Sequence, residues 1–219
     1  MRTDHDLQRD VIAELSWSPM LRNEEIGVAV KDGVVTLSGT VSNYVKKFEA
    51  ERAAEKIHGV KAVALDLNVK LLDSWVRTDT EIAHAALDAL KWDVRVPDDK
   101  LTLRVEDGRV LLEGEVEWQY QRDAAERAVR YLTGVKAVSN FIMVKPKKVS
   151  PFDVSSKIKE AFKRSAEVDS SHITVDSVDG GKVVLKGRVR SWAERRDAEN
   201  AAWAAPGVTS VDDRLAVAL

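Results

Sequence analysis

The chain has 219 residues, of which 34 are Lys or Arg and 36 are Asp or Glu, so its formal net charge is −2. This balance argues against a nucleic-acid binder that relies on bulk charge. The absence of cysteine excludes disulfides. No apolar run reaches membrane-spanning length, and Asp4, Asp6 and Asp10 stand where a signal peptide would carry its apolar stretch. We therefore expect a cytoplasmic protein without a transmembrane segment, or a periplasmic one if an export signal has been removed.

One unit recurs three times in the sequence, with a period of about 75 residues. Each copy contains the pattern Leu-x-Gly-x-Val, at residues 37–41, 112–116 and 185–189. A Gly-Val pair follows in each copy, at residues 59–60, 134–135 and 207–208. Units of this size lie near the lower limit at which one core is stable without help. We place three domains at residues 1–72, 77–146 and 150–219.

An amphipathic helix opens each copy. Leu7, Val11 and Leu15 share one face at helical spacing. The matching apolar positions in the other copies are Ile82, Ala86 and Leu90, then Val154, Ile158 and Phe162. The helices are expected to start at Thr3-Asp4, at Thr78-Asp79, and at Pro151 with Asp153.

Two strands follow the helix and are expected to form a hairpin. In the first copy, residues 26–30 and 35–41 alternate between apolar and polar around Asp32-Gly33, a strong hairpin signal. Asp107-Gly108 repeats the turn in the second copy. The third copy has Asp179-Gly180-Gly181, one residue more, and we expect a different turn or a bulge there.

A second helix and a third strand complete each copy. The helix has a stripe of small residues, such as Ala50, Ala53 and Ala54. We expect Gly39 and its counterparts to lie beneath this stripe, so that helix and sheet approach closely. Third strands are expected over residues 60–69, 135–144 and 208–217. The fold class is therefore α+β, with three tandem αββαβ domains, each a small mixed three-stranded sheet with two helices on one face.

This αββαβ unit resembles the BON domain, a family named for bacterial osmotically inducible protein Y and nodulation. Asp123-Ala124-Ala125-Glu126-Arg127-Ala128 and the run at residues 134–140 carry the resemblance most clearly. The resemblance covers nearly the whole chain and is specific for a fold rather than an activity. It implies a bacterial, stress-associated, non-enzymatic protein that binds phospholipid or membrane surfaces, with no cofactor. A cytoplasmic branch of the family, joined to a LysM domain, implies an association with potassium.

Residues that could carry chemistry are sparse. The four histidines show no ligand spacing, so neither a metal site nor catalytic residues are expected. Trp17 and Trp92 hold matched positions at the ends of the first helices and are expected to cover the core. Trp118 and Trp192 stand at the junction of second strand and second helix, where they mark either an interface with headgroups or protein, or a ring packed on its own helix.

The polar face of the second strand differs in charge between copies. It carries serine and threonine in the first copy and glutamates in the second, where Lys100 is expected to face Glu115. In the third it carries Lys186, Arg188 and Arg190. We expect this basic row to bind an anionic lipid surface or an envelope protein partner, since the Lys145–Pro151 linker disfavours folding back onto the preceding domains. Two alternatives are binding of a monovalent cation such as potassium by carbonyls and carboxylates, and a structural adaptor or oligomerising protein.

Overall fold

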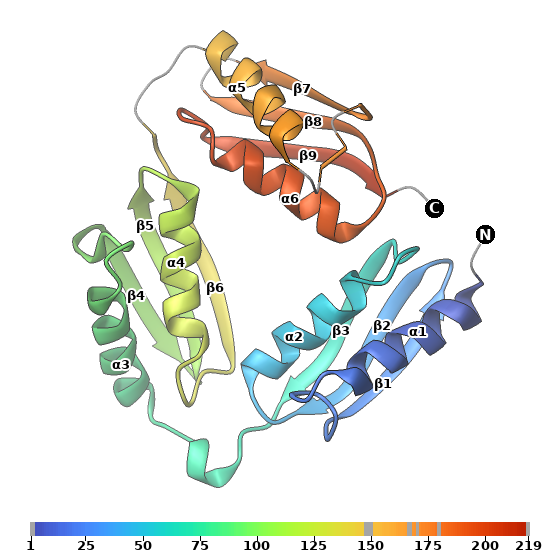
Figure 1. Cartoon of the computed structure of the whole chain (residues 1–219). Helices are drawn as coiled ribbons and strands as arrows, with labels where there is room; N and C mark the ends of the chain where they lie inside the picture. The colour runs from blue at the N-terminus through green and yellow to red at the C-terminus, as the bar shows by residue number, and fades with distance from the viewer. Residues whose placement is uncertain (1–2, 147–150, 166–167, 170, 179–180, 218–219) are drawn as a thin grey trace.

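Three copies of one helix–strand–strand–helix–strand unit follow one another along the chain (Figure 1). The structure is a computed structural model that describes residues 3–146, 151–165, 168–169, 171–178 and 181–217. The first domain consists of α1 (Asp4–Trp17), β1 (Glu25–Lys31), β2 (Val34–Val41), α2 (Tyr44–Glu55) and β3 (Ala62–Val69). The second consists of α3 (Asp79–Trp92), β4 (Leu101–Glu106), β5 (Arg109–Val116), α4 (Gln119–Arg130) and β6 (Ala137–Val144). The third consists of α5 (Pro151–Arg164), β7 (Ile173–Val178), β8 (Lys182–Val189), α6 (Trp192–Trp203) and β9 (Ser210–Val217).

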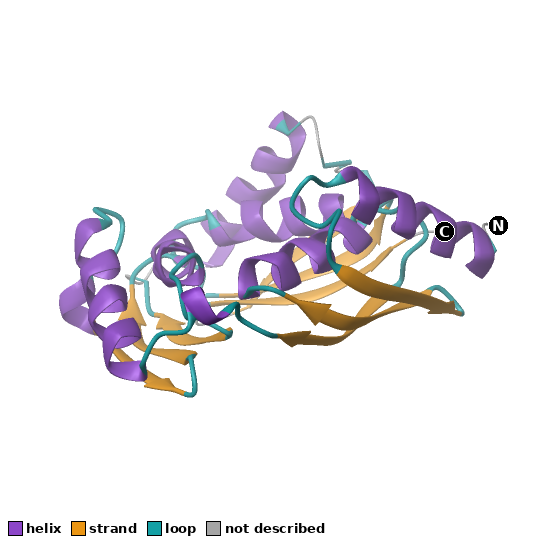
Figure 2. Cartoon of the chain, turned by 90° about the horizontal axis from the view of Figure 1, so that it is seen from below, coloured by secondary structure: helices purple, strands orange, loops and turns teal. Residues whose placement is uncertain are grey.

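Each sheet has the second strand of its domain in the middle. That strand is antiparallel to the first strand and parallel to the third. Both helices cover one face of the sheet, and the other face, called the open face below, carries no helix (Figure 2). This confirms the predicted α+β class and the three mixed three-stranded sheets. Two short 3-10 helices, η1 (Asp73–Trp75) and η2 (Asp98–Lys100), lie in connecting segments.

The first helices bury the face that the sequence predicts. All nine predicted positions are at most 6% exposed, namely Leu7, Val11, Leu15, Ile82, Ala86, Leu90, Val154, Ile158 and Phe162. Thr3 and Thr78 close capping boxes at the starts of α1 and α3, which satisfies backbone N–H groups that have no partner inside the helix.

The Asp-Gly hairpin turns are confirmed in the first two domains. Asp32 and Gly33 have φ angles of 53° and 81°, as a type I′ turn requires. The carboxylate of Asp4, at the start of α1, accepts hydrogen bonds from the backbone N–H of Asp32 at 2.7 Å and of Gly33 at 3.0 Å. Part of the third turn, at residues 179–180, lies outside the described residues.

The expectation that the sheet glycines sit beneath the alanine stripe is wrong. A Cβ at Gly39 would lie 2.1 Å from the carbonyl O of Glu25, on the neighbouring strand, and none of its nearest atoms belongs to a helix. Gly114 and Gly187 meet the carbonyl O of Lys100 and of His172 in the same way. All three have φ between 120° and 136°, a region that favours glycine. These glycines therefore allow the hairpin strands to approach each other at that point.

The expectation that Trp17 and Trp92 cover the core is also wrong. Their side chains are 79% and 84% exposed. Both residues follow the last buried position of their helices, Leu15 and Leu90, by two residues. A step of two residues turns about 200° around a helix, so these rings point away from the core.

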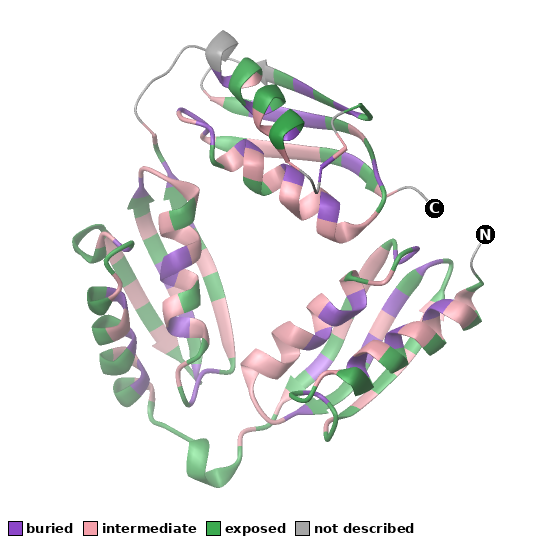
Figure 3. Cartoon of the chain, in the orientation of Figure 1, coloured by how far each residue is buried: buried purple, intermediate pink, exposed green. Residues whose placement is uncertain are grey.

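The three domains form a ring in which α2, α4 and α6 face the centre and α1, α3 and α5 lie outside (Figure 1). The outward side of α3 is exposed, whereas α2 is mostly of intermediate exposure (Figure 3). Seen from below, the three sheets gather on one side of the ring and the helices on the other (Figure 2). The open faces of all three domains therefore belong to the same side of the molecule.

Candidate functional site

The inner helices create three seams between domains, and equivalent positions meet at each seam. At the first seam, the guanidinium of Arg130 on α4 lies 3.6 Å from the centroid of the Phe48 ring on α2. Tyr44, the first residue of α2, packs against the core of the second domain. Burial, the largest effect, raises the pKa of Tyr44. Tyr44 therefore acts as an interdomain contact.

The seam between the third and first domains closes the ring. The indole N–H of Trp192 donates to the carbonyl O of Val60 at 2.6 Å, and the ring packs against the core of the first domain. Arg196 on α6 pairs with Glu55 on α2 at 3.0 Å. The carbonyl O of Arg190 lies 2.8 Å from Nδ1 of His58. The expectation that the linker keeps the third domain from folding back is therefore wrong; linker residues 147–150 lie outside the described residues.

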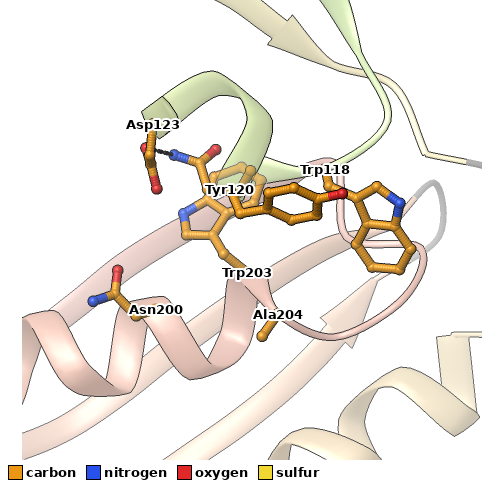
Figure 4. Close-up of a pocket in the computed structure, with 7 residues that line it drawn as sticks. Trp118, Tyr120, Asp123, Asn200, Trp203 and Ala204 are labelled. Carbon is orange, nitrogen blue, oxygen red and sulfur yellow. Dashed lines mark hydrogen bonds between the residues drawn. The ribbon is translucent and has the colours of Figure 1, made fainter. Parts of the chain in front are cut away.

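The seam between the second and third domains contains a cavity of about 660 Å³. Its walls are aromatic rings from both domains together with polar side chains: Trp118, Gln119, Tyr120, Asp123, Asn200, Trp203 and Ala204 (Figure 4). The rings of Trp118 and Tyr120 have centroids 6.5 Å apart and are 28° from parallel. Sequence reasoning singled out Trp118 but missed Tyr120 and Trp203. Alignment of the copies could have pointed to Trp203, because it is the last residue of α6, the position that Arg130 holds on α4.

The three predicted basic residues do not form one row. Lys186 pairs with Asp176 across the hairpin at 2.9 Å, which lowers the pKa of Asp176. Arg190 instead contacts Glu194 of α6 through its backbone N–H at 2.6 Å and its guanidinium at 3.1 Å. Arg188 forms no ion pair within the described ranges. Lys186 and Arg188 therefore lie on the open face, whereas Arg190 follows the end of β8 and its side chain pairs with Glu194.

Glu194 is a buried carboxylate, 4% exposed, at the start of α6. Burial pushes its pKa up, but hydrogen bonds from the backbone N–H groups of Arg190 and Asp169 and from the Arg190 guanidinium outweigh this, so the pKa is lowered. The residue therefore stays ionised and holds the strand–helix junction together.

One further cluster completes the open face of the third sheet. Lys182 and Arg214 both pair with Asp212, at 3.2 Å and 2.8 Å, and these hydrogen bonds lower the pKa of Asp212 to about 2. Counting the strand residues of this face that the structure describes, Lys182, Lys186, Arg188 and Arg214 stand against Asp176 and Asp212. The face therefore keeps a basic surplus.

The open face of the second domain carries apolar side chains that sequence reasoning missed. Phe141 is 65% exposed and Met143 is 53% exposed, and both lie on β6. They stand beside Glu113 and Glu115 of β5. Glu115 forms its ion pair with Lys145 and not with Lys100, the partner that the sequence predicted.

One cluster of the described residues has the composition of a catalytic triad but not its geometry. Ser171, His172 and Asp169 do touch one another, but Ser171 Oγ and Asp169 Oδ2 both contact the same ring nitrogen, Nδ1, at 2.9 Å and 3.2 Å. A triad needs the serine and the carboxylate on different nitrogens. Within the described residues, no group of three or more His, Cys, Asp or Glu side chains is placed to hold a metal ion.

A family model for the BON domain matches residues 3–70, 78–146 and 152–218. The chain belongs to the BON family. This BON protein is also 32% identical over 146 residues to Osmotically-inducible protein Y of Escherichia coli (strain K12), in a match that covers 65% of this chain and 73% of that protein.

Two solved structures match this chain at low identity and a low TM-score. Both are of CdsD, a structural protein of the type III secretion system of Chlamydia trachomatis. One matches at 14% identity with a TM-score of 0.27, covering 97% of this chain and 92% of the other, and the second, its C-terminal domain, at 15% with the same TM-score, covering 100% of both. No helix in the described part of this BON protein is long and apolar enough to cross a membrane.

Proposed function

We propose that this BON protein is a non-catalytic component of the response to osmotic stress that binds anionic phospholipid surfaces. The similarity to Osmotically-inducible protein Y supports the link to osmotic stress. One observation carries the choice of surface: the basic residues of the third domain and the exposed apolar residues of the second lie on open faces that share one side of the ring (Figure 2). Such a combination suits a peripheral membrane protein.

The electrostatic part of the contact comes from the third sheet. Lys186 and Arg188 project from the open face at alternate positions of β8, roughly 6–7 Å apart along the strand. Each basic residue close to an anionic surface contributes about 1 kcal/mol. The pairing of Lys186 with Asp176 reduces its share, so Arg188 is expected to contribute most.

The apolar part comes from β6. Phe141 and Met143 are large apolar side chains that lie two residues apart on β6 and face solvent. Inserting them among lipid headgroups removes apolar surface from water at about 25 cal/mol per Å². Their glutamate neighbours oppose an anionic surface, so initial attraction is expected to come from the third domain and the apolar residues to act at closer range.

Co-sedimentation with vesicles tests the proposal. We expect binding to vesicles containing phosphatidylglycerol, weak binding to pure phosphatidylcholine, and loss of binding as salt is raised. The double variant Lys186→Glu, Arg188→Glu should bind at least about tenfold more weakly, since it reverses two charges at about 1 kcal/mol each. The matched control is Lys163→Glu, Arg164→Glu on α5, where both side chains are exposed on the helix side.

Two outcomes would contradict the proposal: wild-type protein that does not sediment with anionic vesicles, or equal losses in the sheet-side and helix-side variants. Phe141→Ser tests the apolar contribution against Tyr131→Ser, a change at a ring that is 58% exposed at the end of α4. We expect only the Phe141 variant to lose binding.

A further inference from the structure

The three seams of the ring use the same helix positions with different chemistry. Phe48, Asp123 and Arg196 are each the fifth residue of an inner helix, and they face Arg130, Trp203 and Glu55, each the last. At the first seam a cation lies over an aromatic ring, and at the third a cation pairs with a carboxylate. Only at the second seam do a carboxylate and an aromatic ring meet without a cation from the facing position.

The cavity lies at this second seam. Asp123 accepts a hydrogen bond from Nε2 of Gln119 at 2.9 Å, and no Lys or Arg in the described part of the chain forms an ion pair with it. The buried Oε1 of Gln119 has no hydrogen-bond partner among the described residues. Glu199, which does not line the cavity, accepts a hydrogen bond from the indole of Trp203 at 3.4 Å. The wall therefore offers acceptors and π faces, a combination that favours a cation.

The electrostatic surroundings agree with this geometry. Burial, the largest effect, raises the pKa of Asp123 and of Glu199. The negative charges of Asp213 and, less strongly, Asp123 raise the pKa of Glu199 further, whereas Arg195 lowers it. A cation bound beside Asp123 would favour the charged form of its carboxylate and so offset the cost of burial.

We propose that the cavity between the second and third domains binds a small methylated or quaternary ammonium compound, with Trp118, Tyr120 and Trp203 as the aromatic wall and Asp123 as the counter-charge (Figure 4). A volume of about 660 Å³ lies in the range of small-molecule sites. Cations over aromatic faces are attracted by the ring quadrupole, and quaternary ammonium groups are recognised in this way.

An inorganic monovalent ion fits the cavity less well. Small hard cations need a compact shell of oxygen ligands, whereas most of this wall is formed by rings and by Ala204. An anion is disfavoured by the Asp123 carboxylate in the wall. The methylated ammonium group combines positive charge with an apolar surface and so matches both features of the wall. This site does not depend on the proposed lipid-binding surface.

Titration of the full chain with tetramethylammonium chloride tests the assignment, with potassium chloride at equal ionic strength as the reference. We expect saturable binding to the methylated cation by calorimetry and by shifts of indole N–H signals in NMR spectra. Trp118→Ala and Asp123→Asn should each weaken binding about tenfold or more. Their controls are Trp92→Ala, at a ring that is 84% exposed, and Asp88→Asn on α3, an exposed carboxylate, and neither should change the affinity.

The asparagine variant keeps the acceptor for Gln119, so a folded protein with weakened binding separates the ligand role from a structural one. No saturable response to tetramethylammonium, or unchanged affinity in both cavity variants, would overturn the proposal. A parallel arm uses phosphatidylcholine vesicles: displacement by tetramethylammonium would identify lipid headgroups as a second source of the same group. Failure with anionic vesicles would affect only the proposed surface function.

Discussion

Single backbone positions decide how each hairpin is built. The sequence predicts that Gly39, Gly114 and Gly187 matter, because they recur in every copy, but it assigns them the wrong neighbour. Their positive φ and the approach of the preceding strand's carbonyl oxygen are properties of the strand pairing. The alternation of residues along a strand indicates the face on which a position lies but not its backbone conformation. The positive φ and the close carbonyl oxygen could therefore not be predicted from the sequence.

A matched pair of glycine variants tests this account. Gly39→Ala forces a side chain to positive φ with its Cβ 2.1 Å from a backbone oxygen, so it should lower the free energy of unfolding by about 1–3 kcal/mol. Gly27→Ala, on the adjacent strand, meets only the terminal hydroxyl of Ser38 at 2.9 Å and should cost less. Urea denaturation followed by circular dichroism measures both. Equal effects would mean that the close strand approach is unimportant.

The pH dependence of ammonium binding is a second prediction at this scale. Asp123 and Glu199 have raised pKa values, so both take up a proton at a higher pH than an exposed carboxyl does. Affinity for tetramethylammonium should therefore be full at neutral pH and fall as the pH is lowered toward those values. In Asp123→Asn the fall should be smaller. The charged groups that act on the two carboxyls are Arg122, Glu126, Arg127, Arg195 and Asp213. A flat calorimetric profile from neutral to acid pH would contradict this.

At the scale of elements, one carboxylate joins helix and hairpin in each of the first two domains. Asp79, the first residue of α3, accepts hydrogen bonds from the backbone N–H groups of Asp107 at 2.9 Å and Gly108 at 2.8 Å. Asp79→Ala removes both acceptors and should cost about 1–2 kcal/mol of stability. Asp88→Ala, on the same helix, should cost a few tenths at most. Thermal unfolding of both variants compares them, and similar midpoints would show that the turn does not need the helix.

Elements themselves were predicted well, because their signals are local. The buried faces of the first helices follow from apolar spacing, and the Asp-Gly turns from the φ preference of two residues. Trp17 and Trp92 were misplaced because a repeated aromatic was taken as core without counting its angle around the helix. Of the candidate site, Trp118 and Trp192 were singled out, with an interface and a ring packed on its own helix both left open. Their partners were not, since Trp203 and Val60 come close only once whole domains pack together.

The whole molecule depends on closure of the ring. Each seam is chemically distinct, so no repeated sequence pattern marks it. Closure also holds the three open faces on one side (Figure 2), and the proposed lipid-binding surface requires this arrangement. Contacts between the inner helices are therefore expected to affect the proposed lipid binding, which takes place on the opposite face of each sheet.

The seam between the third and first domains offers the sharpest test of closure. Trp192→Ala removes the indole that donates to Val60 and packs on the first core, so the ring should open. Small-angle X-ray scattering should then give a larger radius of gyration and a greater maximum dimension, while Trp92→Ala leaves both unchanged.

The ion pair at the same seam allows a rescue experiment. Arg196→Glu alone places two carboxylates together and should also expand the molecule, whereas the added change Glu55→Arg restores an opposite pair at the same positions. Expansion in the single variant that the double variant does not reverse would show that the contact is not made in solution.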